Sequence, residues 1–301
     1  MKTISSLRRF RSLLAISALA CPMLASSSHA ALIAYDSFDT YTPGADLNGN
    51  NGGTGFTSAW SANTIVDVVN GGLSYNAGNV QVNGGSNAVS INGALAGPTD
   101  NTFSRAFTGQ SSTVYVSFLF QPVVNGGLGQ DDFFQFMLND DTDSENSGTI
   151  GMRNQSGTIG NDGYFVRIRD NTADLGNPEA GVLSVLGRTD FLIGKFSVSG
   201  ANGANFDKFD LFINPTSNTE GAPNATLTGN SVNALIDFFT LRTAFLDTLD
   251  AYRFDELRIG TAFADVVPII PEVAPIVPEP ATMTLAGLGL LALASRRKRM
   301  A

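Results

Sequence analysis

Short runs of alternating apolar and polar residues, separated by tight-turn residues, constrain the fold of this chain more than any other feature. In residues 112–121 the apolar side chains recur on one face of an extended strand; they are Val114, Val116, Phe118 and Phe120. Seven Asn-Gly pairs, from Asn48 to Asn202, favour the positive φ angles of hairpin turns. About a dozen such runs without a long helix predict an all-β fold, an antiparallel two-sheet β-sandwich.

Residues 235–250 fit two structures. Some apolar residues recur at the spacing of an amphipathic helix, namely Phe238, Leu241, Phe245 and Leu249. Aromatic and β-branched residues in the same segment favour a strand. We expect a strand through about Thr243, a turn at residues 247–250 and a closing strand from Tyr252.

The N-terminus has the order of a secretory signal peptide, residues 1–30. A basic start is followed by an apolar helical run at residues 12–24 and by small residues that place cleavage after Ala30. The alternatives are a retained first transmembrane helix and a lipoprotein acylated at Cys21. Cleavage removes Cys21 and His29, the only cysteine and histidine. The mature chain therefore lacks thiol and imidazole chemistry, and it has no disulfide.

The charge of the body differs from that of the whole chain. Of 18 basic residues, four lie in the signal peptide and four in the tail, while all 27 acidic residues lie between Asp36 and Glu279. The body thus carries ten basic residues and a net charge of about −17. Such an acidic body argues against nucleic acid and anionic lipid as partners.

The C-terminus combines three features in a fixed order. A proline-rich linker at residues 267–277 follows the body at residues 31–266, and the tail at residues 278–301 begins with Pro278, Glu279 and Pro280. An apolar run at 281–294 follows, about 21 Å long as a helix against a hydrocarbon core of about 30 Å. A basic cluster then ends the tail, consisting of Arg296, Arg297, Lys298 and Arg299.

This tail resembles a PEP-CTERM sorting signal. The resemblance implies a Gram-negative exporter in which an exosortase-type membrane protease recognises and processes the signal after transient contact with the inner membrane. The destination that it implies is the cell surface or an exopolysaccharide matrix. The short apolar helix with a basic cluster on its cytoplasmic side fits a transient stop in the membrane.

The body has a resemblance of its own. Residues 35–60 and 252–267 resemble the opening and closing strands of concanavalin A-like, laminin-G-like jelly rolls. The resemblance implies that the first and last strands pair, which would make Phe38 a core neighbour of residues 257–259.

No catalytic residues are predicted. Jelly-roll glucanases place their carboxylates in the pattern Glu-x-Asp-x-x-Glu, which is absent here. The body holds few glutamates, at positions Glu145, Glu179, Glu220 and Glu256. Asp255 and Glu256 are adjacent, so a regular strand would point them to opposite faces. We expect Asp255 to act as a cap or partner at a strand edge.

Two binding sites deserve a test. The acidic loop after residue 138 is the best candidate for a calcium site, because Ca²⁺ prefers clustered oxygen ligands; its residues are Asp140, Asp141, Asp143 and Glu145. A solvated loop without metal is the interpretation that we favour, with no other cofactor expected. Trp60, the single tryptophan, could stack on a sugar, but a core anchor is the favoured role. Nearby arginines balance the acidic loops: Arg153, Arg167 and Arg169.

The leading hypothesis is a non-enzymatic, surface-sorted β-sandwich with a structural or carbohydrate-interacting role in exopolysaccharide or biofilm. Two alternatives stay open. One is a carboxylate-dependent glycan hydrolase or lyase, and the other is a calcium-dependent adhesion module.

Overall fold

The computed structural model describes most of the body. The described residues are 32–62, 65–93, 101–123, 128–129, 132–140, 148–154, 162–170, 173–174, 178–229, 234–248 and 250–269. Several predicted features lie outside them: the cleavage point at Ala30, the metal candidates Asp141, Asp143 and Glu145, the Pro278, Glu279 and Pro280 motif, and the basic cluster from Arg296 to Arg299.

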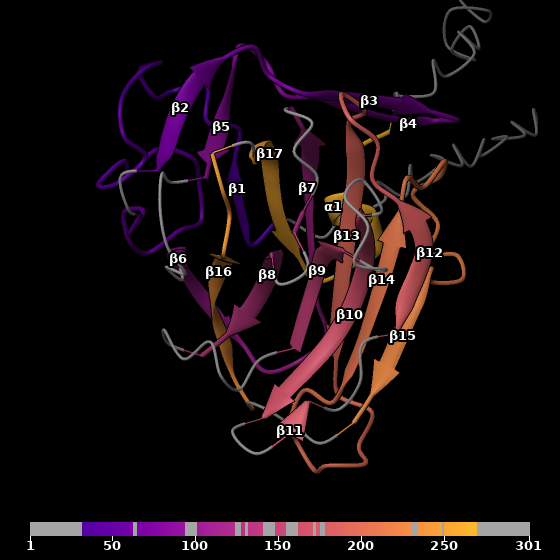
Figure 1. The fold of residues 1–301 in the computed structure, drawn as a ribbon. Helices are drawn as coiled ribbons and strands as arrows, with labels where there is room; N and C mark the ends of the chain where they lie inside the picture. Colours follow the sequence, from indigo (N-terminus) through magenta and orange to yellow (C-terminus); the bar gives the residue numbers. More distant parts are fainter. Residues whose placement is uncertain are drawn as a thin grey trace, which may run out of the picture.

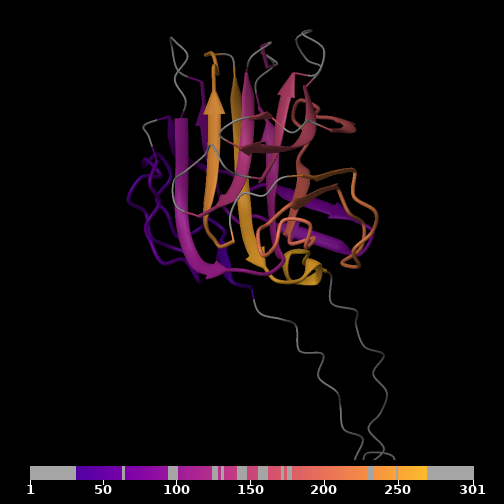
Figure 2. The same ribbon diagram turned by 90° about the horizontal axis from the view of Figure 1, so that it is seen from below.

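Two antiparallel sheets form a sandwich, which confirms the predicted fold class (Figures 1 and 2). The eight-stranded sheet has the order β15 (Ala225–Thr228), β14 (Lys208–Ile213), β13 (Asp190–Ser197), β7 (Val114–Pro122), β17 (Ala251–Gly260), β5 (Asn87–Asn92) and β2 (Val66–Asn70), with β1 (Ala34–Asp36) also paired to β17. The seven-stranded sheet has the order β11 (Ala173–Asp174), β10 (Asp162–Asp170), β9 (Gly148–Asn154), β8 (Phe133–Asn139), β16 (Ile236–Ala244) and β6 (Asn101–Gln110), with β12 (Glu179–Leu183) paired to β10.

The first and last strands pair as the resemblance implied. Ala34 of β1 lies opposite Ile259 of β17, and Asp36 lies opposite Leu257. Phe38 is buried in the same core cluster as Leu257 and Ile259. The pairing brings the two ends of the body together although more than 200 residues separate them.

The ambiguous segment forms two strands. β16 covers Ile236–Ala244 and β17 begins at Ala251, and the amide of Asp250 donates to the carbonyl of Asp247 at 3.0 Å in the turn between them. The strand prediction is therefore confirmed. β16 lies between β6 and β8, where both of its edges form ladders that a helix could not supply.

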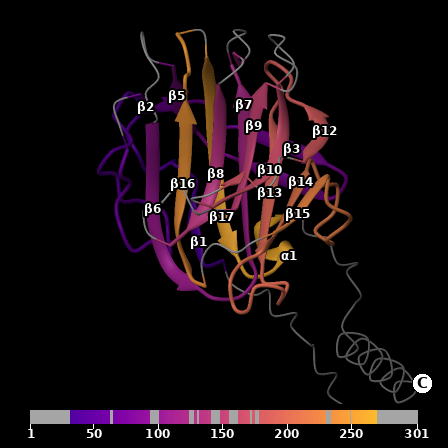
Figure 3. The ribbon, with the colours of Figure 1, turned by 60° about the horizontal axis from the view of Figure 1, so that its bottom comes forward.

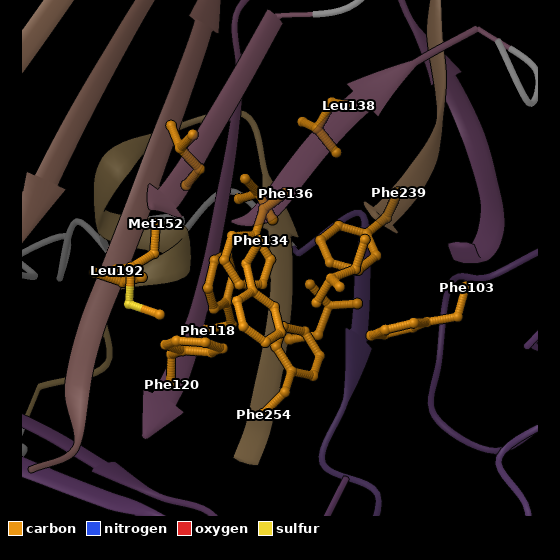
Figure 4. Close-up of a cluster of buried hydrophobic side chains, with 14 of the residues drawn as sticks. Phe103, Phe118, Phe120, Phe134, Phe136, Leu138, Met152, Leu192, Phe239 and Phe254 are labelled. Atoms are coloured by element: carbon orange, nitrogen blue, oxygen red, sulfur yellow. The ribbon is translucent and has the colours of Figure 1, made fainter. Parts of the chain in front are cut away.

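The core between the sheets is rich in phenylalanine (Figure 4). The ring centroids of Phe118 in β7 and Phe136 in β8 lie 4.2 Å apart, and Phe254 of β17 lies 5.1 Å from Phe118. Phe118 and Phe136 face each other across the two sheets, whereas Phe118 and Phe254 lie on neighbouring strands of the eight-stranded sheet. Aromatic burial of this extent is a large part of the hydrophobic stabilisation.

A second, smaller core lies on the outer face of the eight-stranded sheet. The hairpin of β3 (Ser74–Ala77) and β4 (Val80–Asn83) lies across the strands there, and α1 (Phe263–Val266) packs beside it (Figure 1). Val80 and Val82 contribute to this cluster together with Val266 and Val267. Packing thus continues past residue 266, to the bridge between Ile269 and Val80. The sequence pattern did not predict this hairpin.

A bulge interrupts β17 and corrects the expectation for Asp255. The register shifts between Asp255 and Arg258, and Glu256 has a φ of 56°. Phe254 and Leu257 consequently both face the core although they are three residues apart. Asp255 lies in a central strand, not at an edge, where it accepts hydrogen bonds from the amides of Leu73 at 2.8 Å and Glu256 at 2.7 Å.

Candidate functional site

At one end of the sandwich, three aspartates stand two residues before an inward-facing aromatic ring at the start of a strand. The pairs are Asp132 and Phe134 in β8, Asp162 and Tyr164 in β10, and Asp250 and Tyr252 in β17. Because side chains two apart in a strand share a face, each carboxylate continues the inner face beyond its ring. The rings of Phe134 and Tyr252 lie 4.1 Å apart, so strands from opposite sheets meet here. We call these three aspartates the acidic mouth.

Backbone amides hold two of these carboxylates side by side. The carboxylate of Asp162 accepts from the amide of Leu128, with distances of 3.2 and 3.1 Å to its two oxygens. Asp132 Oδ2 accepts from the next amide, that of Gly129, at 2.7 Å. Asn154 Nδ2 donates to the Leu128 carbonyl at 2.8 Å and fixes the same short segment.

The third carboxylate, that of Asp250, has one oxygen without a partner. Its Oδ2 accepts from the amide of Asp247 at 2.8 Å, while Oδ1 is buried and has no hydrogen bond. Asp250 is 1% exposed, against 9% for Asp132 and 7% for Asp162. Among the described residues, neither Asp162 nor Asp250 forms a salt bridge with a lysine or an arginine.

The electrostatics of the acidic mouth follow from this burial. Burial raises the pKa of Asp250 to about 7, against the hydrogen bond from Asp247, and the charges of Asp247, Asp132 and Asp162 raise it further. Burial also raises the pKa of Asp162, and the charge of Asp132 adds to the effect. The cluster thus concentrates negative charge in a place with little water to screen it.

The predicted acidic loop lies elsewhere. Asp140 follows β8, whereas Asp132 precedes it, so the strand separates them by about 26 Å. The structure brings Asp132 to Asp162, because the consecutive amides of Leu128 and Gly129 bind the two carboxylates. An aspartate two residues before an inward-facing ring also occurs at Asp207 and Phe209 of β14, outside the acidic mouth, so this spacing does not identify the mouth without the strand pairing.

The outer face of the seven-stranded sheet carries a second group of candidate residues. The guanidinium of Arg242 lies 5.0 Å from the ring centre of Phe133, and that of Arg153 lies 5.4 Å from the ring centre of Phe165. Both are cation–π contacts. Arg242 Nη1 also donates to Gln135 Oε1 at 3.2 Å. We call these five residues the arginine–aromatic face.

Alternation along the strands shows that the side chains of this face point away from the core between the sheets. Phe133 and Gln135 alternate with the core residues Phe134 and Phe136 in β8. Gly151 in β9 leaves room for Phe165, since a Cβ there would lie 2.6 Å from that ring. Arg153 Nε, on the same face, is buried without a hydrogen-bond partner. Arg167 alternates with core residues of β10, and the side chain of Arg169 lies outside the described part.

Trp60 has the core role and not the sugar-stacking role. Its side chain is 2% exposed, and its ring packs on Phe38 and Phe103 with centroid distances of 5.9 and 6.2 Å. Its Nε1 donates to Asp36 Oδ2 at 3.0 Å. The ring is therefore not accessible to a sugar. On the seven-stranded sheet, Phe133 and Phe238 lie outside the core clusters and are partly exposed, whereas Phe165 is only 1% exposed.

The described glutamates do not form a carboxylate pair. Glu256 is buried, accepts from the hydroxyl of Tyr35 at 2.8 Å and pairs with Arg258. Glu220 pairs with Lys195 at 2.6 Å on the eight-stranded sheet. Glu179 lies 3.5 Å from Arg153, near the arginine–aromatic face.

One pocket of about 340 Å³ lies beside α1. The loop that follows β14 forms its wall, including Asn214, Thr216 and Ser217, and the rings of Phe212 and Phe263 form its apolar floor. It is separate from both groups described above. Among the described residues, no group of three or more His, Cys, Asp and Glu side chains has the spacing of metal ligands.

The fold is that of an antiparallel β-sandwich protein. Comparison with known proteins identifies a motif in its C-terminal tail. Residues 277–299 match the PEP-CTERM protein-sorting motif, so the chain carries this motif. The motif implies export with a transient membrane anchor and processing by an exosortase. None of the helices in the described part is long and apolar enough to cross a membrane.

Solved structures with a similar fold have low sequence identity. Endo-1,3-beta-glucanase from Streptomyces sioyaensis is 13% identical over 77% of this chain and 96% of its own, with a TM-score of 0.45. The cellulose induced protein Cip1 is 14% identical over 76% and 97%, with a TM-score of 0.44. Peanut lectin is 10% identical over 65% and 91%, with a TM-score of 0.41. No curated protein sequence matches the chain. These likenesses concern the fold and carry no argument about function.

Proposed function

We propose that this protein is an exported, surface- or matrix-sorted β-sandwich that binds extracellular polysaccharide without catalysing a reaction. The observation that carries the proposal is the arginine–aromatic face on a sandwich that bears a sorting motif. Aromatic rings stack on sugar rings, and guanidinium groups donate several hydrogen bonds to hydroxyl or carboxylate oxygens. Within this face, the ring of Phe133 is partly exposed and the side chain of Arg153 is 36% exposed, so these two residues can meet such a ligand.

The position of the chain ends supports a tethered module. Leu32 packs against the cluster that holds Val266 and Val267, so both ends of the body leave from one region. β17 runs roughly 30 Å from the acidic mouth to its end near α1 (Figure 3). A sandwich held by its C-terminal tail would thus present the acidic mouth away from the membrane.

Binding is favoured over hydrolysis at the arginine–aromatic face because one glutamate, Glu179, borders that face and no second described glutamate lies beside it. A retaining glycosidase needs two carboxyl groups about 5 Å apart. The described glutamates are dispersed: Glu179 borders the arginine–aromatic face, while Glu220 and Glu256 have partners on the other sheet. A hydrolase or lyase remains the alternative, and release of reducing ends from a bound polymer would establish it.

The experiment is a pull-down of the exported protein with insoluble neutral and acidic polysaccharides. We expect Phe133→Ala and Arg153→Ala each to weaken binding by about tenfold, the effect of losing about 1.4 kcal/mol. Arg253→Ala is the matched control, because Arg253 lies on the outer side of β17 and contacts the Gly71 carbonyl. Absence of binding to every polymer, or equal loss in the control, would contradict the proposal.

A further inference from the structure

The pocket beside α1 lies where the chain leaves the body. Ile269, the last residue that the structure describes, forms an antiparallel bridge with Val80 of β4. Because the bridge is antiparallel, the chain runs past Val80 in the direction of Asn79. The amide of Asn79 donates to the carbonyl of Thr216, a residue of the pocket wall, at 3.1 Å. The described chain therefore ends beside the pocket and runs toward its wall.

Hydrogen bonds hold both ends of the loop that forms the wall. At the start of the loop, Asn214 accepts from the amide of Phe191 at 2.8 Å and donates to Asp190 Oδ1 at 2.7 Å. At its end, Asn224 Oδ1 accepts from the amide of Ile213 at 2.8 Å. The pocket is thus formed before a ligand binds, which lowers the entropic cost of binding.

The pocket has an aromatic floor and a wall with hydroxyl groups. The rings of Phe212 and Phe263 meet edge to face, with their centroids 5.1 Å apart. Thr216 and Thr219 of the wall are exposed, and threonine hydroxyls can donate to carbonyl oxygens. A polyproline II helix needs both features, because its carbonyl groups have no internal hydrogen bonds. Aromatic-lined grooves bind proline-rich segments in several classes of peptide-binding domain.

The linker that follows Ile269 has a sequence that matches this pocket. Four of its prolines are three or four residues apart: Pro268, Pro271, Pro275 and Pro278. Such a density of proline favours a polyproline II helix, which has three residues per turn. With this period, Ile270, Val273 and Ile276 form an apolar stripe on one side, and Glu272 lies on another. The pocket volume of about 340 Å³ is in the range that holds a ligand.

We infer that this pocket binds the proline-rich linker of the same chain, with Ile270 and Val273 against its aromatic floor. The docked linker is a stiff spacer between the body and the Pro-Glu-Pro motif, which begins at Pro278. Nine residues of polyproline II helix beyond the bridge at Ile269 span about 28 Å. Docking thus holds the sorting motif at a set distance from the acidic sandwich. The inference depends on the sorting motif and not on polysaccharide binding.

Disulfide trapping tests the inference directly. Cys21, the single cysteine, lies in the predicted signal peptide, so the exported chain offers a cysteine-free background. Val273→Cys is combined either with Ala222→Cys in the pocket or with Asn76→Cys, which is exposed on β3, one strand beyond β4. A free linker would meet both positions at a similar effective concentration. The docked linker should form the disulfide with the pocket position about tenfold faster, as measured by mass spectrometry of the oxidised protein.

Two further changes in the linker provide a matched pair, and both lie beyond the body. Ile270→Ser should slow the trapping between positions 273 and 222 by about tenfold, because it removes an apolar side chain from the floor. Glu272→Gln, on another side of the helix, should leave the rate unchanged. Equal rates at the two body positions, or equal effects of the two linker changes, overturn the inference. A disulfide that joins two molecules also overturns it, since the occupant would then be a second copy.

Discussion

Arg105 and Asp36 form an ion pair inside the sandwich, with Nη1 2.6 Å from Oδ2 and each side chain 1% exposed. Asp36 belongs to β1 of the eight-stranded sheet and Arg105 to β6 of the seven-stranded sheet, so the pair joins the two sheets. Asp36 Oδ2 also accepts from the hydroxyl of Tyr41 at 2.5 Å. Arg105 Nη2 donates to the Gly52 carbonyl at 2.7 Å and Nε to the Ser58 carbonyl at 2.8 Å.

Removing one member of this pair should strongly destabilise the protein. Arg105→Ala leaves the Asp36 carboxylate buried without its cation, and such a loss costs about 3–5 kcal/mol. Arg153→Ala, at the more exposed pair with Glu179, should cost less than about 1 kcal/mol. Urea denaturation measures both free energies of unfolding. Similar losses of unfolding free energy in the two variants would show that the buried pair stabilises the protein no more than the exposed pair does.

The pH dependence of stability should report Asp255. Burial raises its pKa to about 9, and the charges of Glu256 and Asp39 add to the rise against the two backbone hydrogen bonds. The folded state therefore holds this proton to a higher pH than the unfolded chain, whose carboxyl titrates near 3.9. The stabilisation is complete below the unfolded pKa and declines as pH rises toward 9.

Asp255→Asn removes this titration and isolates its contribution. Between pH 5 and 8 the wild type should lose stability relative to the variant by about 1.4 kcal/mol per pH unit. The offset between the two proteins at one pH is not informative, because the amide also changes the bonds to Leu73 and Glu256. The relevant quantity is the difference in slope, from urea titrations in EDTA at several pH values. Parallel curves would contradict the raised pKa.

Strand periodicity predicted most of the sandwich, because burial on one face imposes an alternation that is visible in the sequence. It correctly favoured a strand for residues 236–244, where β-branched and aromatic residues outweigh the helix-like spacing. It could not predict the bulge at Glu256, since the insertion of one residue depends on which strands pair with β17. It also could not predict a buried Arg105, which is stable only because Asp36 lies opposite.

The candidate sites were less predictable than the fold. The sequence predicted a candidate site from acidic residues that are close in the chain, at 140–145. The acidic mouth instead combines Asp132, Asp162 and Asp250 from three strands. Only the pairing of the strands shows that the three strands begin at the same end of the sandwich. Trp60 was a reasonable stacking candidate by residue type, but the core at the β1 end required a large ring with one donor for Asp36.

Gly55 should tolerate no side chain, because two effects oppose substitution. Its φ is 77°, and a Cβ would lie 1.9 Å from the Ile33 carbonyl oxygen, beside the bonds between Tyr35 and Thr54 that hold this loop to β1. Gly200 has a similar φ of 86° with nothing within 4 Å of a Cβ, so Gly200→Ala measures the backbone strain alone, about 1–2 kcal/mol. Gly55→Ala should lose roughly 1–3 kcal/mol more through the clash with β1. Urea denaturation of both variants gives the difference, and equal losses would mean that the loop moves away from β1 without cost.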